Sequence, residues 1–153
     1  MNSPMMNRSV LLAYLATVLY AQKGRLRYLE LGTAFNETLG LVAQTVLQAQ
    51  CFGVDLRPID PQLPNVRMRA MTTSTYLNEY ARQDGPFDLV YIAADHSFVA
   101  VKNDFGAVWP LVSQQSLVCL DDTWPDTEAN TASGLSGSAH LMADWLAYRY
   151  EHV

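Results

Sequence analysis

The sequence has few cysteines, few lysines and no long hydrophobic run. Its two cysteines, Cys51 and Cys119, show neither a CxxC nor a Cys/His spacing, so a structural zinc site is not expected and both are predicted to be buried free thiols. Charged residues make up 16% of the 153 residues and hydrophobic residues 50%, which excludes a disordered chain. A net charge of −5 with only two lysines argues against nucleic-acid and membrane partners. The length suits one domain.

The most apolar stretch, residues 10–21, follows Arg8 and superficially resembles a signal peptide. It is too short to cross a bilayer as a helix, and the small residues that precede a cleavage site are missing. Its leucines and valines recur at helical spacing. We therefore expect residues 1–24 to form an N-terminal helix that packs on a domain formed by residues 25–153, in a cytoplasmic protein.

Short apolar runs then alternate with segments of helical periodicity. The expected strands are residues 26–31, 51–54, 87–94 and 117–120, and the expected helices cover 39–46, 98–112 and 141–146. This alternation predicts an α/β fold, with βαβ units, a mostly parallel sheet and helices on both faces. Residues 66–71 alternate apolar side chains with arginines, as an edge strand does, which favours the doubly wound order 3-2-1-4-5. Trp109 and Trp145 fall on the helical stripes and are expected in the core.

Acidic residues stand where four of the predicted strands end. They are Glu30, Asp55, Asp95 and the pair Asp121 and Asp122. Because the carboxyl ends of parallel strands form the ligand crevice of an open α/β sheet, these carboxylates should point into one cleft. Each of them, taken singly, can also be a helix cap or a turn residue. Together they predict a site that binds hydroxyl groups, a cation or both.

The turn after the first strand indicates which ligand the cleft takes. Gly32 permits a tight turn and close approach of a ligand, and Asn36 tolerates the left-handed conformation that a second glycine would adopt. The GxGxxG fingerprint is absent, and Glu30 would repel a pyrophosphate. Asp55, 23 residues beyond Gly32, can accept hydrogen bonds from both hydroxyls of a ribose. The cofactor implied is a nucleoside without phosphates.

Three segments resemble the class I S-adenosylmethionine-dependent methyltransferases, and especially the small-molecule O-methyltransferases. They are E-x-G-x-x-x-N from Glu30, Val-Asp-Leu-Arg at residues 54–57, and FDLVYIAADHSF at residues 87–98. The resemblance covers about residues 25–125 and implies a Rossmann-like fold. It implies that Asp55 holds the ribose, that Leu56 packs on adenine, and that Thr72 and Thr73 lie at the adenine edge. The cofactor-binding residues expected in all are Glu30, Gly32, Thr33, Asn36, Asp55, Leu56, Thr72 and Thr73.

The resemblance also bears on the chemistry. In metal-dependent members, a carboxylate two residues before the Asp95 position binds the ion together with an acidic or amide pair after the fifth strand. Asp121 and Asp122 match that pair and are the expected ligands of a hard cation such as Mg²⁺, but Ala93 stands at the other ligand position. We expect Asp95 or His96 to act as the base, since histidine accepts a proton near neutral pH. Alternatively, Asp95 or Ser97 caps the following helix and His96 is a loop residue.

Several functions stay open at this point. The first is methyl transfer from S-adenosylmethionine to a hydroxyl of a small molecule. The second is a catalytically inactive module of the same fold that binds S-adenosylmethionine or S-adenosylhomocysteine, and a third is an NAD-dependent oxidoreductase, which keeps Asp55 but lacks the glycines. The resemblance implies a sixth strand near the last residues of the sequence, so we expect the closing antiparallel hairpin to be largely absent. The open sheet edge that this leaves predicts a homodimer. Trp124 either forms an aromatic wall beside the acceptor or fills the cleft.

Overall fold

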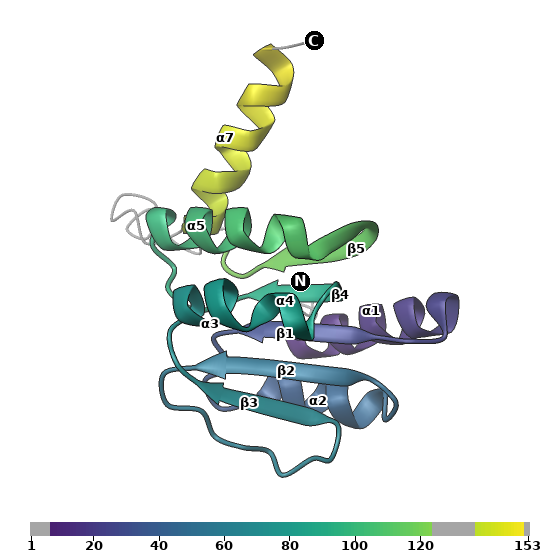
Figure 1. Cartoon of the computed structure of the whole chain (residues 1–153). Helices are drawn as coiled ribbons and strands as arrows, with labels where there is room; N and C mark the ends of the chain where they lie inside the picture. Colours follow the sequence, from purple (N-terminus) through teal and green to yellow (C-terminus); the bar gives the residue numbers. More distant parts are fainter. Residues whose placement is uncertain (1–6, 124–136, 152–153) are drawn as a thin grey trace, which may run out of the picture.

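The apolar runs of the sequence form one parallel sheet. The computed structural model describes residues 7–123 and 137–151. The strands are β1 (Arg27–Leu31), β2 (Gln50–Asp55), β3 (Val66–Ala70), β4 (Phe87–Ile92) and β5 (Val112–Leu120). All four pairings are parallel, and the order is β3-β2-β1-β4-β5 (Figure 1). The predicted strand order is confirmed, with β3 at one edge as its alternating arginines indicated.

Helices cover both faces of the sheet, as predicted. The helices α1 (Arg8–Lys23) and α2 (Glu37–Thr45) pack on one face. The other face carries α3 (Thr73–Glu79), α4 (Ala81–Asp84), α5 (Phe98–Val108) and the 3₁₀ turn η1 (Trp109–Leu111). The last helix, α7 (Gly137–Glu151), contacts α5 and extends away from the sheet (Figure 1). In the described part of the chain, no helix has both the length and the apolar character needed to span a bilayer.

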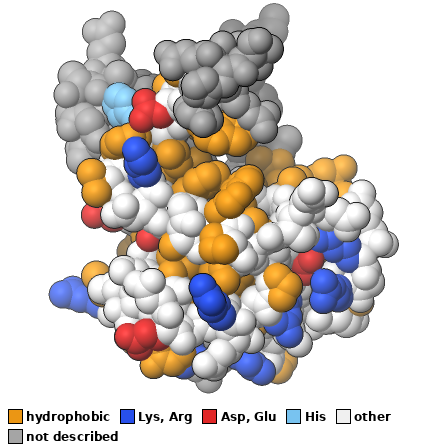
Figure 2. Space-filling model, turned by 45° about the horizontal axis from the view of Figure 1, so that its top comes forward, with side chains coloured by type: hydrophobic (Ala, Val, Ile, Leu, Met, Phe, Trp, Pro, Cys, Tyr) orange, Lys and Arg blue, Asp and Glu red, His pale blue; other side chains and the backbone are white. Residues whose placement is uncertain are grey.

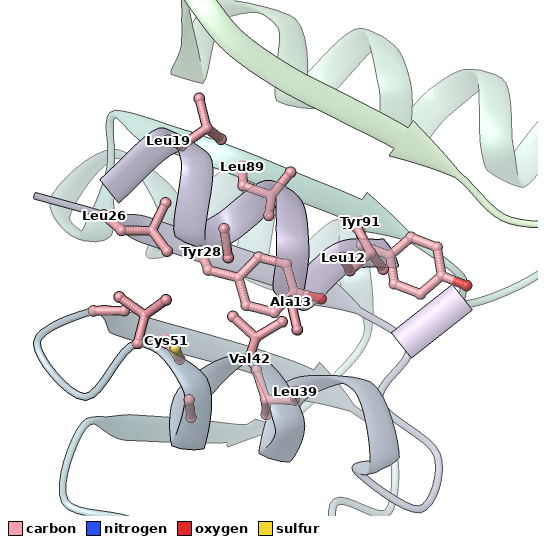
Figure 3. Close-up of a cluster of buried hydrophobic side chains, with 14 residues drawn as sticks. Leu12, Ala13, Leu19, Leu26, Tyr28, Leu39, Val42, Cys51, Leu89 and Tyr91 are labelled. Atoms are coloured by element: carbon pink, nitrogen blue, oxygen red, sulfur yellow. The ribbon is translucent and has the colours of Figure 1, made fainter. Parts of the chain in front are cut away.

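The strand side chains alternate between two hydrophobic clusters, which is why the central strands are apolar at nearly every position. Tyr28 of β1 lies in the cluster under α1 and α2, together with Leu12, Val42 and the buried thiol of Cys51 (Figure 3). Leu29 and Leu31 of the same strand, shifted by one residue, lie in the cluster under α3, α4 and α5. This two-sided burial fixes where β1 ends, and therefore where the turn that follows it lies.

The part of the chain after β3 departs from the sequence expectation in four respects. The helix predicted over residues 98–112 stops at Val108, because η1 tightens the chain, and β5 begins at Val112 rather than residue 117. The expected burial of Trp109 and Trp145 is wrong, since their exposed fractions are 57% and 40%. Trp109 lies beyond the end of α5, and Trp145 of α7 lines an open groove beside α5 and β5 rather than the core. The helices α3 and α4 lie where the apolar pattern predicted none.

Candidate functional site

Two adjoining cavities lie at the carboxyl edge of the sheet, where the sequence predicted a single cleft. The first, here called the β2 cavity, has a volume of about 490 Å³ and contains Asp55, Leu56, Thr72, Thr73 and Asp95 in its lining. The second, here called the α1 cavity, has a volume of about 320 Å³. Its polar lining residues are Arg8, Glu30, Thr33, Glu37, Thr38, Tyr91, His96 and Asp121. The two cavities share Gly32, Ala34, Ala93 and Ala94, so one elongated ligand can reach into both.

Gly32 lines both cavities and lies close to the backbone at the end of β4. Its φ is +85°, and its backbone N–H donates a 2.8 Å hydrogen bond to the carbonyl oxygen of Val54. A Cβ atom here would lie 2.5 Å from the carbonyl oxygen of Ala93, which only glycine avoids. Asn36, at the start of α2, has the left-handed conformation that the sequence predicted, with φ of +61°. The turn therefore brings the tips of β1, β2 and β4 together.

Asp55 is oriented by the backbone and lies in the β2 cavity. Its Oδ2 accepts a hydrogen bond from the N–H of Ala34 at 3.0 Å, and its Oδ1 accepts one from the N–H of Arg57 at 2.9 Å. Within the described residues, no lysine or arginine side chain forms an ion pair with it. Each carboxylate oxygen keeps acceptor capacity for one more donor. Leu56, with an exposed fraction of 68%, offers an apolar surface beside it.

The two threonines after β3 also line the β2 cavity. The side chain of Thr72 caps α3 by accepting a 3.0 Å hydrogen bond from the N–H of Thr75. The hydroxyl of Thr73 donates to Oδ1 of Asp104 at 2.8 Å. Asp104 is buried, and this burial raises the pKa of its carboxyl. Because the Thr73 proton is used in this bond, its oxygen is left with acceptor capacity alone.

Glu30 sits at the inner wall of the α1 cavity, with an exposed fraction of only 2%. The hydroxyl of Tyr28 donates to its Oε2 at 2.6 Å. Burial is the main cause that raises the pKa of Glu30, to about 8, so this carboxyl is largely protonated at neutral pH. Glu30 therefore presents a hydrogen-bonding group rather than a full negative charge, and the repulsion of a pyrophosphate expected from the sequence does not follow from it at neutral pH.

Two neighbouring side chains keep unused hydrogen-bonding capacity. Thr33 is buried in the lining of the α1 cavity, and its Oγ1 has no hydrogen-bond partner within the described residues. The side-chain amide of Asn36 is also buried without a partner there, although Asn36 lines neither cavity. A buried polar group without a partner costs about 1–3 kcal/mol. The Thr33 hydroxyl therefore points to a ligand in the α1 cavity.

The two residues expected to supply a base have different surroundings. Nδ1 of His96 lies 2.6 Å from Oδ2 of Asp122, so this carboxylate orients the imidazole ring, which lines the α1 cavity. Asp95 lies in the β2 cavity and accepts a 2.8 Å hydrogen bond from the N–H of Ser97, which lowers the pKa of Asp95. The side chain that caps α5 is Ser97 rather than Asp95. Which of the two acts as the base stays a prediction.

The acidic pair after β5 is divided between two partners. Oδ2 of Asp121 lies 3.0 Å from Nη1 of Arg8, and Asp122 pairs with His96. Ala93 offers no ligand atom in its side chain. The described residues contain no group of three or more histidine, cysteine or acidic side chains that could hold a metal ion. In this arrangement each carboxylate of the pair faces a side chain that can carry a positive charge, and the predicted Mg²⁺ site stays a prediction.

Sequence reasoning missed four polar residues of the α1 cavity, namely Arg8, Glu37, Thr38 and Tyr91. Tyr91 stands opposite Glu30 in the β1–β4 register, so the alternation along β4 contained a signal for it. Burial, and then the charge of Asp121, raise the pKa of Tyr91. Arg8 precedes the whole sheet, and no spacing in the sequence connects it with the site. Trp124, for which two roles were open, lies outside the described residues.

The start of α7 is docked on the loop that carries His96. The N–H of Gly137 donates to the carbonyl oxygen of His96 at 2.6 Å. A Cβ atom on Gly137 would lie 2.6 Å from the carbonyl carbon of Ser97, so the two backbones are in close contact. The ring of Phe98 meets His140 edge to face, with centroids 6.2 Å apart. The position of His96 therefore depends on α7.

Comparison with known proteins agrees with this fold. A family model described as a methyltransferase domain matches residues 29–123. The MycE methyltransferase from the mycinamycin biosynthetic pathway, solved with Mg and SAH, is 20% identical with a TM-score of 0.71, over 95% of this chain and 44% of that chain. A putative caffeoyl-CoA O-methyltransferase from Staphylococcus aureus is 16% identical with a TM-score of 0.66, over 94% of this chain and 75% of that chain.

A third structure, cofactor-bound Rv0187 from MTB, is 18% identical with a TM-score of 0.66, over 92% of this chain and 71% of that chain. At these identities the structural likeness establishes the fold alone. No curated protein matches the sequence. The chain spans less than half the length of the MycE enzyme.

Proposed function

The chain belongs to the methyltransferase domain family, and from that premise we propose that it binds S-adenosylmethionine and transfers its methyl group to a hydroxyl of a small molecule. The observation that carries the proposal is the pair of cavities that meet at Gly32. One is suited to a nucleoside, and the other has the charged and hydrogen-bonding groups that an amino-acid end requires. A ligand with both ends and no phosphate matches S-adenosylmethionine.

The β2 cavity would hold the adenosine end. Asp55 has acceptor capacity for both ribose hydroxyls, and such charge-assisted hydrogen bonds contribute about 1.5–3 kcal/mol each. Leu56 offers its exposed side chain to one face of the base. Thr72 and Thr73 line the same cavity and would meet the adenine edge. Glu30, Gly32 and Thr33 line the second cavity, toward which the sulfonium and the amino-acid end would extend.

The α1 cavity would also hold the acceptor hydroxyl, next to His96. When bound, S-adenosylmethionine supplies an electrophilic methyl group. As the acceptor oxygen attacks, its proton must leave, and His96 would take it on Nε2 because Nδ1 already faces Asp122. Asp122 would fix the ring orientation and stabilise the imidazolium that forms. Asp95, whose pKa is lowered by the Ser97 N–H, is a weaker base and lines the other cavity.

The small-molecule acceptor is also part of the proposal. One of the similar MycE structures contains mycinamycin VI together with Mg and SAH. That likeness supports a small hydroxylated acceptor for this chain as a class. Because Asp121 pairs with Arg8 and Asp122 pairs with His96, the proposed reaction uses no metal ion.

The proposal is tested by calorimetric titration with S-adenosylmethionine and S-adenosylhomocysteine, with and without Mg²⁺. We expect both to bind, and Asp55→Ala to weaken binding at least about tenfold. Asp60→Ala is the matched control, since Asp60 is an exposed aspartate that lines neither cavity. Labelled methyl transfer to a panel of catechols, phenols and sugars then tests activity. Binding without any transfer would favour the inactive module, and binding of NAD alone would overturn the proposal.

We further propose that the protein is a cytoplasmic homodimer. Within the described residues, β5 pairs only with β4, so its other edge is open, and the strand has neither a charged residue nor a proline to protect it. Hydrophobic side chains gather on one face of the molecule (Figure 2). An apolar groove of about 770 Å³ between α5, β5 and α7 contains Phe105, Trp109 and Met142 and has no titratable side chain. These features suit a protein contact rather than catalysis, and the mass in dilute solution checks the assembly.

A further inference from the structure

The backbone of Arg8 is held in place by the packing of α1, whereas its side chain is largely exposed. It is the first residue of α1, whose Leu12 and Ala16 are buried in the core, and the adjacent Ser9 hydroxyl lies 2.9 Å from that of Thr38 on α2. The Arg8 side chain itself is 63% exposed and reaches Oδ2 of Asp121 with its Nη1 at 3.0 Å. The Asp121 side chain is only 15% exposed, so the pair is open to solvent on the Arg8 side, from which another anionic partner can approach the guanidinium.

The α1 cavity has a charge pattern that suits a zwitterion. Among the described residues that line it, Arg8 is the one lysine or arginine. Carboxylates stand nearby: Asp121 faces Arg8 directly, and Glu37 lies in the first turn of α2. The buried hydroxyl of Thr33, without a partner in the described residues, lies in the same wall. A ligand group with one carboxylate and one ammonium would satisfy both signs of charge.

We propose that Arg8 recognises the α-carboxylate of the amino-acid end of the cofactor, which replaces Asp121 as the partner of its guanidinium. The inference rests on the proposed function. The planar guanidinium can donate two parallel hydrogen bonds to a carboxylate, which a lysine cannot do. Asp121, once released, faces the ammonium of the same group. Arg8 thereby distinguishes the complete cofactor from adenine thionucleosides that lack the amino acid.

Two ligands separate this role from the rest of the site. S-Adenosylhomocysteine has both the nucleoside and the amino-acid end, whereas 5′-methylthioadenosine has the nucleoside and the thioether alone. Calorimetric titration of Arg8→Ala should show S-adenosylhomocysteine binding weakened at least about tenfold and 5′-methylthioadenosine binding changed less than about twofold. Arg8→Lys should give an intermediate loss. Arg82→Ala, which removes the same charge from α4 and lines neither cavity, should change neither affinity.

The outcomes that contradict the role are distinct from those that contradict the proposed function. If Arg8→Ala leaves the affinity for S-adenosylhomocysteine unchanged, or lowers the affinities for both ligands equally, Arg8 does not recognise the carboxylate. In either case Asp55→Ala should still weaken both ligands, which keeps the proposed function in place. If the unaltered protein binds neither ligand, the proposed function fails and the role of Arg8 fails with it. Circular dichroism of each variant verifies that the fold is intact.

Discussion

Replacing Gly32 with alanine should destabilise the fold and weaken cofactor binding together. The new Cβ atom would meet the backbone of Ala94 and would lie 2.5 Å from the carbonyl oxygen of Ala93. Neither obstacle is the end of a flexible side chain, so relief requires the tip of β1 to move away from the tip of β4. In addition, the φ of +85° is unfavourable for any residue with a Cβ atom.

The size of the effect follows from these two terms. A left-handed backbone costs an alanine about 1–2 kcal/mol, and an added methyl in a closely packed place costs about 1–3 kcal/mol. The free energy of unfolding should therefore fall by roughly 2–5 kcal/mol, a large part of the 5–15 kcal/mol of a typical domain. With a denaturant slope of about 2 kcal/mol/M, the urea midpoint should fall by roughly 1–2.5 M.

Gly106→Ala is the matched control for urea denaturation followed by circular dichroism. Gly106 is exposed in the interior of α5, and a Cβ there meets nothing within 4 Å, so this change should raise stability by about 0.5–1 kcal/mol. Since Gly32 lines both cavities, Gly32→Ala should also weaken S-adenosylhomocysteine binding by at least about tenfold. A Gly32→Ala protein as stable as the unaltered one would refute the close approach of the β1 and β4 tips.

Two other measurements probe the α1 cavity. Glu30 has a pKa raised from 4.5 to about 8 in the fold, so the native state binds more protons than the unfolded state in that interval, and the free energy of unfolding should decrease as the pH rises from about 4.5 to about 8. Glu30→Gln should flatten this dependence, and an equal slope in both proteins would contradict the burial of an uncharged Glu30. Asp122→Asn should lower kcat at least about tenfold and alter the pH–rate profile, because His96 loses the carboxylate that orients Nδ1, whereas KM for the cofactor should stay unchanged. An unchanged pH–rate profile would leave Asp122 with a merely structural role.

Local sequence patterns were sufficient for the central part of the fold. Apolar runs predicted four strands, and the alternation with Arg67 and Arg69 correctly predicted that β3 lies at an edge. The turn after β1 could also be predicted, because the conformations of Gly32 and Asn36 depend on the backbone angles that each residue allows. The pattern failed at Trp109, where apolar residues at helical spacing continued past the actual end of α5.

The sequence by itself determined which residue types stand at the ends of the strands, since strand periodicity and turn preferences are properties of short windows. Only the tertiary structure decided how those side chains are partnered. It divides the expected cleft into two cavities, and it brings Arg8 to Asp121 across 113 positions of the chain and His96 to Asp122 across 26. These contacts depend on the way α1 packs on the sheet and on the course of the chain after β5. Such packing arises from many distant contacts at once, so no local pattern contains it.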